Sequence, residues 1–247
     1  MCDSRKKNNL ENNSNFTTNN KADENKQNTE VFKRSSSEEL RGSDENTIGA
    51  KISDRLRRSV ETAKSELNGK ELPKHKQEDL EKRIAFEYAK ENGLWYDNLY
   101  SLGQATGLGG NENTLALDNE NNVLFKSNNL FNSQFLISQL LEQVKVHNWL
   151  FPETRYEVIG LTGIDHGKNK VPYIEVILKQ AFVRDASNAM PQEISNFMES
   201  LGFEKINDSS YTNGKYTVSD LHPRNVLKDK NGFIHIVDNI ISENKSK

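Results

Sequence analysis

The chain has 247 residues, a net charge of −3 and a mean hydropathy of −0.83, which is low for a fully packed globule and favours a domain with a polar extension. Its 33 basic residues are interleaved with 36 acidic ones, so composition gives no support for a nucleic-acid or anionic-membrane partner. No stretch approaches the roughly 18 apolar residues of a membrane span, and Cys2, the single cysteine, has no partner for an intrachain disulfide. We therefore expect a cytoplasmic protein in a reducing compartment.

The first 47 positions predict a disordered polar tail. They contain ten asparagines and few large apolar side chains. This is too little apolar surface to offset the entropy cost of ordering the chain.

Residues 48–92 predict a helical segment. Apolar residues recur at steps of three and four, and Gly69 follows them, which indicates one amphipathic helix: Ile52, Leu56, Val60, Ala63 and Leu67. A second helix is expected from Lys76 to Asn92, ended by Gly93. The first helix either packs on the main domain or serves as a contact surface for a partner.

Residues 93–247 predict an α+β domain, because short β-rich stretches alternate with helical periodicity. The expected strands are Leu99–Gly103 and Asn113–Asp118 around a glycine-rich connection, Asn122–Phe125 ending at Lys126, Arg155–Thr162, and Val171–Phe182. The expected helices are Phe131–Val146 and Pro191–Leu201.

A β-hairpin near the end of the chain brings two polar residues together. Asn231-Gly232 predicts a two-residue turn, because both central residues of such a turn adopt positive φ. Counting five residues outward on each side places Asn225 opposite Asp238, with Cβ atoms about 5 Å apart. Two oxygen donors at that separation suit a hard divalent cation such as Mg²⁺.

Asp220 lies five residues before Asn225, in the stretch Asp220-Leu221-His222-Pro223-Arg224-Asn225. Pro223 interrupts regular structure there, so we expect Asp220 on a loop whose end is fixed by the hairpin. A carboxylate in that place could orient an acceptor hydroxyl and take its proton.

The order Asp220-x4-Asn225-x12-Asp238 resembles the catalytic loop and metal-binding aspartate of protein kinases and of aminoglycoside phosphotransferases. Residues 93–241 resemble more closely the kinase domain of polyvalent proteins, found on phages and bacterial mobile elements. Four strings carry this resemblance: Gly109-Gly110-Asn111-Glu112, His147-Asn148-Trp149-Leu150-Phe151-Pro152, Arg155-Tyr156-Glu157-Val158-Ile159-Gly160, and the stretch from Asp220 to Leu227.

The resemblance implies a minimal protein-kinase-like fold with an antiparallel-sheet N-lobe and a reduced C-lobe, using ATP and Mg²⁺. It implies that Asp220 is the catalytic base and that Asn225 and Asp238 are the metal ligands. Lys126 would hold the α and β phosphates, under a phosphate cover formed by Gly107, Gly109 and Gly110. Gln180 and Phe182 would belong to the interlobe hinge that binds adenine.

Three points stay open in the sequence. The carboxylate partner of Lys126 is Glu142, from the following helix, or Glu112, after the glycines. His147, beside Trp149 and Phe151, is either a hydrogen-bonded structural residue or a catalytic one, and we expect the first. The acceptor is a protein Ser/Thr/Tyr hydroxyl, with Ser35–Ser37 as candidate self-acceptors, or a small molecule; the remaining alternative is a catalytically silent module that binds nucleotide or a partner.

Overall fold

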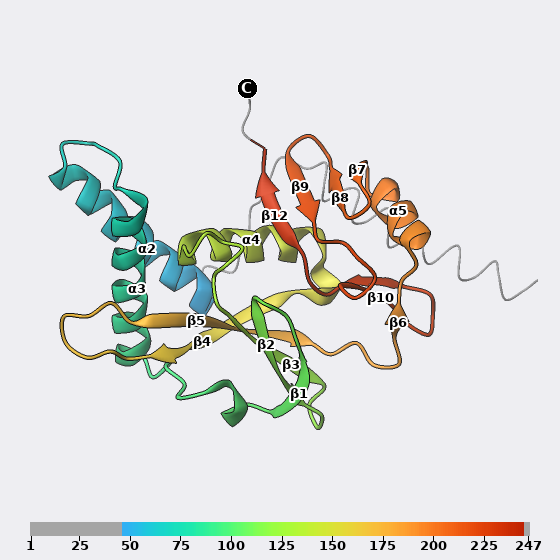
Figure 1. Ribbon diagram of the computed structural model, residues 1–247, viewed down its shortest axis with the longest axis horizontal. Helices are drawn as coiled ribbons and strands as arrows, with labels where there is room; N and C mark the ends of the chain where they lie inside the picture. Colours follow the sequence, from blue (N-terminus) through green and yellow to red (C-terminus); the bar gives the residue numbers. More distant parts are fainter. Residues whose placement is uncertain (1–45, 245–247) are drawn as a thin grey trace, which may run out of the picture.

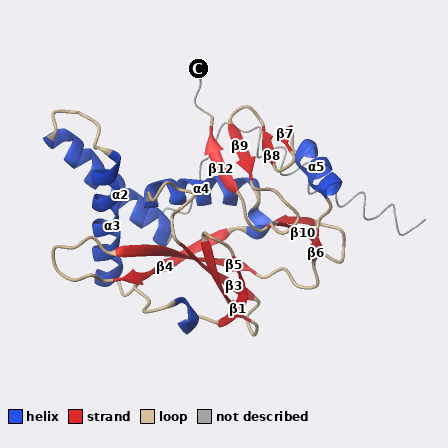
Figure 2. Ribbon diagram, viewed as in Figure 1, coloured by secondary structure: helices blue, strands red, loops and turns tan. Residues whose placement is uncertain are grey.

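The computed structural model describes residues 46–244 and shows an α+β protein with antiparallel sheets, as the sequence predicts (Figures 1 and 2). The predicted tail, apart from its last two residues, lies outside this range, as do Cys2 and Ser35–Ser37. None of the helices within residues 46–244 is long and apolar enough to cross a membrane.

The largest sheet has five strands in the order β1-β2-β3-β5-β4 and is antiparallel throughout. Its strands are β1 (Gln104–Gly109), β2 (Asn113–Asp118), β3 (Val123–Asn128), β4 (Tyr156–Ile164) and β5 (Tyr173–Ala181). β2 has the predicted bounds, and β4 and β5 agree with prediction to within two residues at each end. The central strand β3 runs two residues past Lys126, so Lys126 lies inside the strand rather than at its predicted end.

Both faces of this sheet are covered, which explains the nearly continuous apolar run of β5. Val176 and Leu178 point into a core shared with the helices, whereas Ile177, between them, packs into a smaller core on the opposite face. The short helix η1 (Leu99–Ser101) contributes Leu99 to that smaller core. Successive side chains of a strand point to opposite faces, so the apolar residues of β5 contribute to a core on each side of the sheet.

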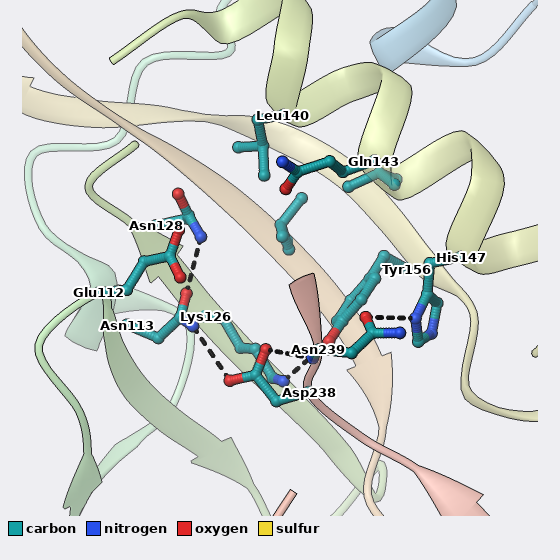
Figure 3. A pocket seen from close by; sticks show the side chains of 12 residues that line it. Glu112, Asn113, Lys126, Asn128, Leu140, Gln143, His147, Tyr156, Asp238 and Asn239 are labelled. Atoms are coloured by element: carbon teal, nitrogen blue, oxygen red, sulfur yellow. Dashed lines mark hydrogen bonds between the residues drawn. The ribbon is translucent and has the colours of Figure 1, made fainter. Parts of the chain in front are cut away.

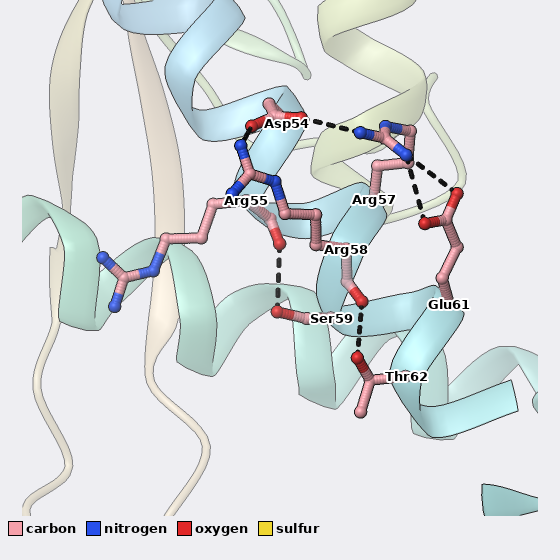
Figure 4. A network of polar contacts seen from close by, with 7 residues as sticks. All are labelled: Asp54, Arg55, Arg57, Arg58, Ser59, Glu61 and Thr62. Carbon is pink, nitrogen blue, oxygen red and sulfur yellow. Dashed lines mark hydrogen bonds and ion pairs between the residues drawn. The ribbon is translucent and has the colours of Figure 1, made fainter. Parts of the chain in front are cut away.

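Three helices cover the other face (Figure 1). They are α2 (Ile48–Glu66), α3 (Lys74–Glu91) and α4 (Ile137–Leu150). Ile52 and Leu56 of α2 are 1% exposed and share one core with β4 and β5, so α2 packs on the sheet. Its outer face carries ion pairs that link Asp54, Arg57 and Glu61 (Figure 4).

Helix α4 has no side-chain cap of its own, because Leu136 occupies its N-cap position. Glu81 of α3 supplies the missing acceptor: it is fully buried and accepts from Ser138 N at 2.9 Å and Ser138 Oγ at 2.7 Å. Gln77 Nε2 also donates to this carboxylate, at 2.8 Å. A negative group accepts from the free N–H groups at a helix N-terminus and interacts favourably with the positive end of the helix dipole. Glu81 of α3 therefore fixes the start of α4.

The C-terminal part is built around a second core that also takes in the end of α4, through Val146 and Leu150. It holds a three-stranded sheet, order β11-β10-β6, and a four-stranded sheet, order β12-β9-β8-β7. Its elements are η2 (Pro152–Thr154), β6 (Ser187–Asn188), α5 (Pro191–Ser200), β7 (Glu204–Asn207), β8 (Ser210–Thr212), β9 (Tyr216–Ser219), β10 (Val226–Lys228), β11 (Ile234–Ile236) and β12 (Ile240–Glu243). Helix α4 therefore packs against both parts of the molecule (Figure 1).

Two predicted elements were wrong in position. Leu99–Gly103 is not a strand, because Asn98 Oδ1 accepts from Ser101 N at 3.1 Å and starts the turn of η1. The glycine-rich stretch after it is itself the strand β1. Helix α4 begins at Ile137 instead of Phe131, because Asn128 and Asn129 accept from the backbone N–H groups two residues on and hold the preceding loop in turns.

Candidate active site

The hairpin predicted around Asn231-Gly232 exists, but its turn is one residue longer than expected. Val226 pairs with Ile236 rather than with Val237, and Asp229 N donates to Phe233 O at 3.0 Å, which leaves a three-residue loop. Only Gly232, at φ +92°, adopts positive φ there, as in hairpin loops that place a glycine after a type I turn. The prediction of a two-residue turn was therefore wrong, and Asn225 is not paired directly opposite Asp238.

Asn225 still joins Asp238 to the loop that carries Asp220. Its carbonyl accepts from Val237 N at 2.9 Å and from Asp238 N at 3.3 Å, so just beyond the ends of β10 and β11 two residues on one side of the hairpin face one on the other, as in a β-bulge. Its side-chain Nδ2 donates to Asp220 Oδ2 at 2.8 Å and to Asp220 O at 2.9 Å. The extra residue at the bulge keeps Asp238 next to Asn225 despite the shifted register.

Asp220 lies on a loop, as predicted, directly after β9. Its backbone has φ +65°, a left-handed conformation that costs free energy for a residue with a Cβ and is tolerated best by Asn and Asp. Its side chain is 45% exposed and also lies 3.4 Å from His222 Nε2. The carboxylate is therefore held from one side by Asn225 and open to solvent on the other.

Lys126 lies on β3, 3% exposed, facing the segment that leads to Asp238. Its Nζ donates to Val237 O at 2.6 Å and to Tyr156 Oη at 3.1 Å. Burial lowers the pKa of Lys126, and the negative charges of Asp238 and Glu112 oppose that shift. Since the ammonium is engaged with protein groups, it reaches neither carboxylate by a direct ion pair in this arrangement.

The two candidate partners of Lys126 occupy different environments. Glu142 is 60% exposed and pairs with Lys145 at 3.8 Å, on the outer side of α4. Glu112 lines the same cavity as Lys126 and hydrogen-bonds Asn132, accepting from its backbone N at 3.2 Å. Burial and the nearby Asp238 raise the pKa of Glu112. The geometry therefore favours Glu112 over Glu142.

The glycines lie on β1 and just after it. The prediction that they form a connection between two strands was therefore wrong. Gly107 and Gly109 belong to β1, with φ of +66° and +146°, and Gly110 begins the loop to β2. A Cβ on Gly109 would lie 2.8 Å from Asn113 O, so only glycine allows the two strands to approach this closely here. This irregular strand ends beside Glu112 and Asn113, both of which line the cavity.

The proposed hinge residues lie at the end of β5. Gln180 is 2% exposed and donates from Nε2 to Thr154 O at 2.5 Å, so its side chain is buried between the two parts of the molecule. Phe182 N donates to Asn122 O at 2.9 Å and prolongs the ladder with β3. That backbone donor is therefore already used within the fold.

A cavity of about 30 Å³ separates α4 from β3, with room for one or two water molecules (Figure 3). Its polar lining comes from Glu112, Asn113, Lys126, Asn128, Gln143, His147, Tyr156, Asp238 and Asn239. Asn128 Nδ2 donates to Asn113 Oδ1 at 3.1 Å, and Asn113 Nδ2 donates to Asp238 Oδ2 at 3.2 Å. This chain of amides connects the five-stranded sheet to Asp238.

His147 and Tyr156 also line the cavity. His147 is 1% exposed, with Nε2 3.0 Å from Thr154 O and Nδ1 3.1 Å from the side chain of Asn239, so it is a hydrogen-bonded structural residue, as expected. Burial lowers its pKa to about 4. Tyr156 Oη donates to Val237 O at 2.6 Å, and burial raises its pKa well above the usual range.

Sequence reasoning gave no role to Asn113, Asn128, Tyr156 or Asn239. Asparagines at strand ends are common turn residues, so nothing in the local pattern distinguishes these. The one available signal was Tyr156, the first aromatic residue of a string that resembles the kinase family.

Asn225 and Asp238 are the residues that could hold a magnesium ion. Because Asn225 Nδ2 is directed at Asp220, its Oδ1 is the atom left as an acceptor, and no hydrogen bond from the described residues reaches it. Mg²⁺ is usually bound by one or two protein oxygens together with substrate phosphates. Residues 46–244 contain no cluster of three or more His, Cys, Asp or Glu side chains that could hold a metal ion.

Comparison with known proteins identifies the family. A model of the serine/threonine/tyrosine kinases found in polyvalent proteins matches residues 77–245, more than half of the chain. No curated protein and no solved structure gives a significant match. The chain therefore belongs to the family of serine/threonine/tyrosine kinases found in polyvalent proteins, a membership that indicates a kinase-like phosphotransferase.

Proposed function

We propose that this chain transfers the γ-phosphoryl group of ATP, with Mg²⁺, to Ser, Thr or Tyr hydroxyls of a protein. One observation carries the proposal: the backbone of Asn225 bonds Asp238 while its side chain bonds Asp220, so that a single residue ties together a solvent-facing carboxylate and a second carboxylate. In-line transfer to a hydroxyl needs a carboxylate at the acceptor and metal ligands at the phosphates, and these residues are candidates for both roles.

In the proposed reaction, the Asp220 carboxylate accepts a hydrogen bond from the acceptor hydroxyl and aligns its oxygen with the γ-phosphorus. The bond from the acceptor oxygen to phosphorus forms as the bond to the β–γ bridging oxygen breaks, ADP leaves, and the hydroxyl proton passes to Asp220. Asn225 Oδ1 and the Asp238 carboxylate would hold Mg²⁺, which neutralises charge that develops on the phosphate oxygens.

The remaining proposed roles involve the five-stranded sheet. Gly107, Gly109 and Gly110 would cover the phosphates with backbone N–H groups, and Lys126 would contact the α and β phosphates after it leaves Val237 O. Glu112 would then be its carboxylate partner. Gln180 and Phe182 would lie beside adenine, where the sheet meets the C-terminal part.

A second candidate function is a catalytically silent module that binds nucleotide or a partner. One observation favours it: Lys126 is 3% exposed and bonded to Val237 O and Tyr156 Oη, so in this arrangement its ammonium is not presented to a phosphate. Activity requires that these two hydrogen bonds open when ATP binds.

The experiment is a measurement of ATP turnover and self-phosphorylation by the wild type, Asp220→Ala and the control Asp165→Ala. Asp165 is an exposed aspartate that follows the last residue of β4, at the opposite end of that strand from Tyr156. We expect Asp220→Ala to lose about 10²- to 10⁴-fold in rate, as for the loss of a general base, and Asp165→Ala to keep the wild-type rate. Equal rates in all three proteins would refute the assignment, and ATP-dependent thermal stabilisation without turnover would favour the silent module.

A further inference from the structure

We propose that Tyr156 and His147 are positioning residues that hold residues 237–239 from both sides and thereby place the Asp238 carboxylate; we call this pair the polar clamp. The proposal rests on the proposed function, in which Asp238 is a metal ligand. Neither residue touches substrate or metal, and each acts through a neighbour of Asp238.

Residues 237–239 need such support because they lie between two strands. β11 ends at Ile236 and β12 begins at Ile240, so no sheet ladder fixes the carbonyls of the three residues between them. On the amide side, Val237 N and Asp238 N share one acceptor, Asn225 O. The orientation of this segment therefore depends on side chains that reach it from elsewhere.

On one side of Asp238, Tyr156 holds the carbonyl of Val237. Its Oη donates to Val237 O at 2.6 Å and accepts from Lys126 Nζ at 3.1 Å, and the Lys126 ammonium lies 4.9 Å from the centre of the tyrosine ring. When Lys126 turns to a phosphate, Tyr156 keeps the carbonyl paired. A buried carbonyl left without a donor would cost free energy, so Tyr156 allows Lys126 to move without loosening Asp238.

On the other side, His147 holds the amide of Asn239. His147 Nε2 faces Thr154 O and must carry the proton, so in a neutral imidazole Nδ1 is an acceptor. A side-chain oxygen of Asn239 3.1 Å from Nδ1 would repel it, and Asn239 Nδ2 would be buried without an acceptor. Exchanging the two amide atoms, which have the same shape, resolves both conflicts: Asn239 Nδ2 donates to His147 Nδ1.

The two halves of the clamp are built on one rigid piece of structure. Asn148, next to His147, accepts from Tyr156 N at 2.6 Å and donates to Tyr156 O at 2.7 Å. The rings of His147 and Tyr156 are packed with centroids 4.5 Å apart. Thr154, between them in the chain, donates from Oγ1 to Ile236 O at 2.7 Å. The end of α4 and the start of β4 thus form a single support for the segment that carries Asp238 (Figure 3).

The first test needs no ligand. Hydrogen exchange of the amides of residues 237–239 is measured in wild type, Tyr156→Phe and Asn239→Ala, with Tyr173→Phe as control. Tyr156→Phe removes one oxygen and keeps the packed ring, whereas Tyr173 bonds Glu175 on a strand end away from the site. We expect about 10-fold faster exchange in the first two variants, as for a lost hydrogen bond, and no change in the control. If the amides of residues 237–239 exchange at the wild-type rate in both Tyr156→Phe and Asn239→Ala, which we call the clamp variants, the proposal is overturned.

The second test measures the affinity of Mn²⁺, a spectroscopic substitute for Mg²⁺, by electron paramagnetic resonance with a non-hydrolysable ATP analogue. Because residues that orient metal ligands typically change affinity by 10- to 100-fold, we expect about 10-fold weaker binding in Tyr156→Phe and Asn239→Ala. His147→Asn, which keeps a polar atom near the position of Nδ1, should bind more tightly than His147→Gln.

The outcomes separate the two claims. If Asp238→Ala abolishes Mn²⁺ binding while both clamp variants bind like the wild type, the clamp is refuted and the proposed function stands. If Asp238→Ala binds Mn²⁺ like the wild type, the proposed metal site is refuted. The clamp then has no role in metal binding, whatever the hydrogen-exchange rates of residues 237–239 are.

Discussion

Lowering the pH should destabilise this protein through His147. Burial lowers its pKa from the ordinary 6.5 to about 4, so between these values the unfolded chain binds a proton that the folded chain does not. Stability contributed by the neutral imidazole is complete above about pH 6.5 and is lost as the pH falls, because protonation then favours the unfolded state. At about 1.36 kcal/mol per pH unit, acidification from pH 7 to about pH 4.5 should remove about 2.5 kcal/mol.

The assay is urea unfolding near pH 7 and near pH 4.5 for the wild type and His147→Gln, a side chain that does not titrate. Its Nε2 can still donate to Thr154 O. All other titrating groups are common to both proteins, so the difference between their two pH effects isolates His147. We expect the wild type to lose about 2.5 kcal/mol more than the variant. An equal loss in both proteins would refute the conclusion that the buried imidazole is neutral.

Three further predictions concern stability. Glu81→Ala should cost about 2 kcal/mol in urea unfolding, because it leaves the start of α4 without an acceptor; a cost within error would contradict its capping role. Gly163→Ala should cost clearly more than Gly167→Ala in thermal unfolding: both have positive φ, but only at Gly163 would a Cβ meet a backbone oxygen, at 2.1 Å, and equal costs would contradict this reasoning. Asp54→Ala should leave Tm unchanged, because its ion pairs on α2 are exposed to solvent, and a large drop would show that the network of Figure 4 stabilises the fold.

The strands and helices that sequence predicts well here are those whose periodicity is imposed by burial. β2, α5 and the apolar run of β5 follow directly from which side chains face a core. The boundaries set by local side-chain hydrogen bonds were missed. Asn98 starts a turn where a strand was expected, and Asn128 and Asn129 delay α4. Polar turn residues compete with regular structure in a way that hydrophobic periodicity does not record.

In the candidate site, too, some features could be predicted from the sequence and others could not. The sequence predicts the loop of Asp220 and a hairpin that brings Asn225 near Asp238, because proline and the Asn-Gly pair constrain the backbone locally. The register was wrong by one residue, since Asn231-Gly232 is compatible with a two- or a three-residue turn. The bulge at Asn225 compensates for the error, and only a structure can reveal such compensation.

The residues around Lys126 could not be predicted, because they come from elements far apart in the chain. Tyr156, His147 and Asn239 meet only when α4, β4 and the segment before β12 pack together. None belongs to a recognisable local motif of donors or acceptors. Tertiary packing alone brings them to the cavity.

The central claim is that Asn225 and Asp238 converge on one metal ion beside Asp220. A crystal structure with Mg²⁺ and a non-hydrolysable ATP analogue tests it most directly. We predict one Mg²⁺ bound by Asn225 Oδ1 and an Asp238 oxygen at about 2.1 Å, with Lys126 turned from Val237 O to a phosphate. A structure in which the two side chains bind no common metal, or in which Asp220 points away from the γ-phosphate, would contradict the account.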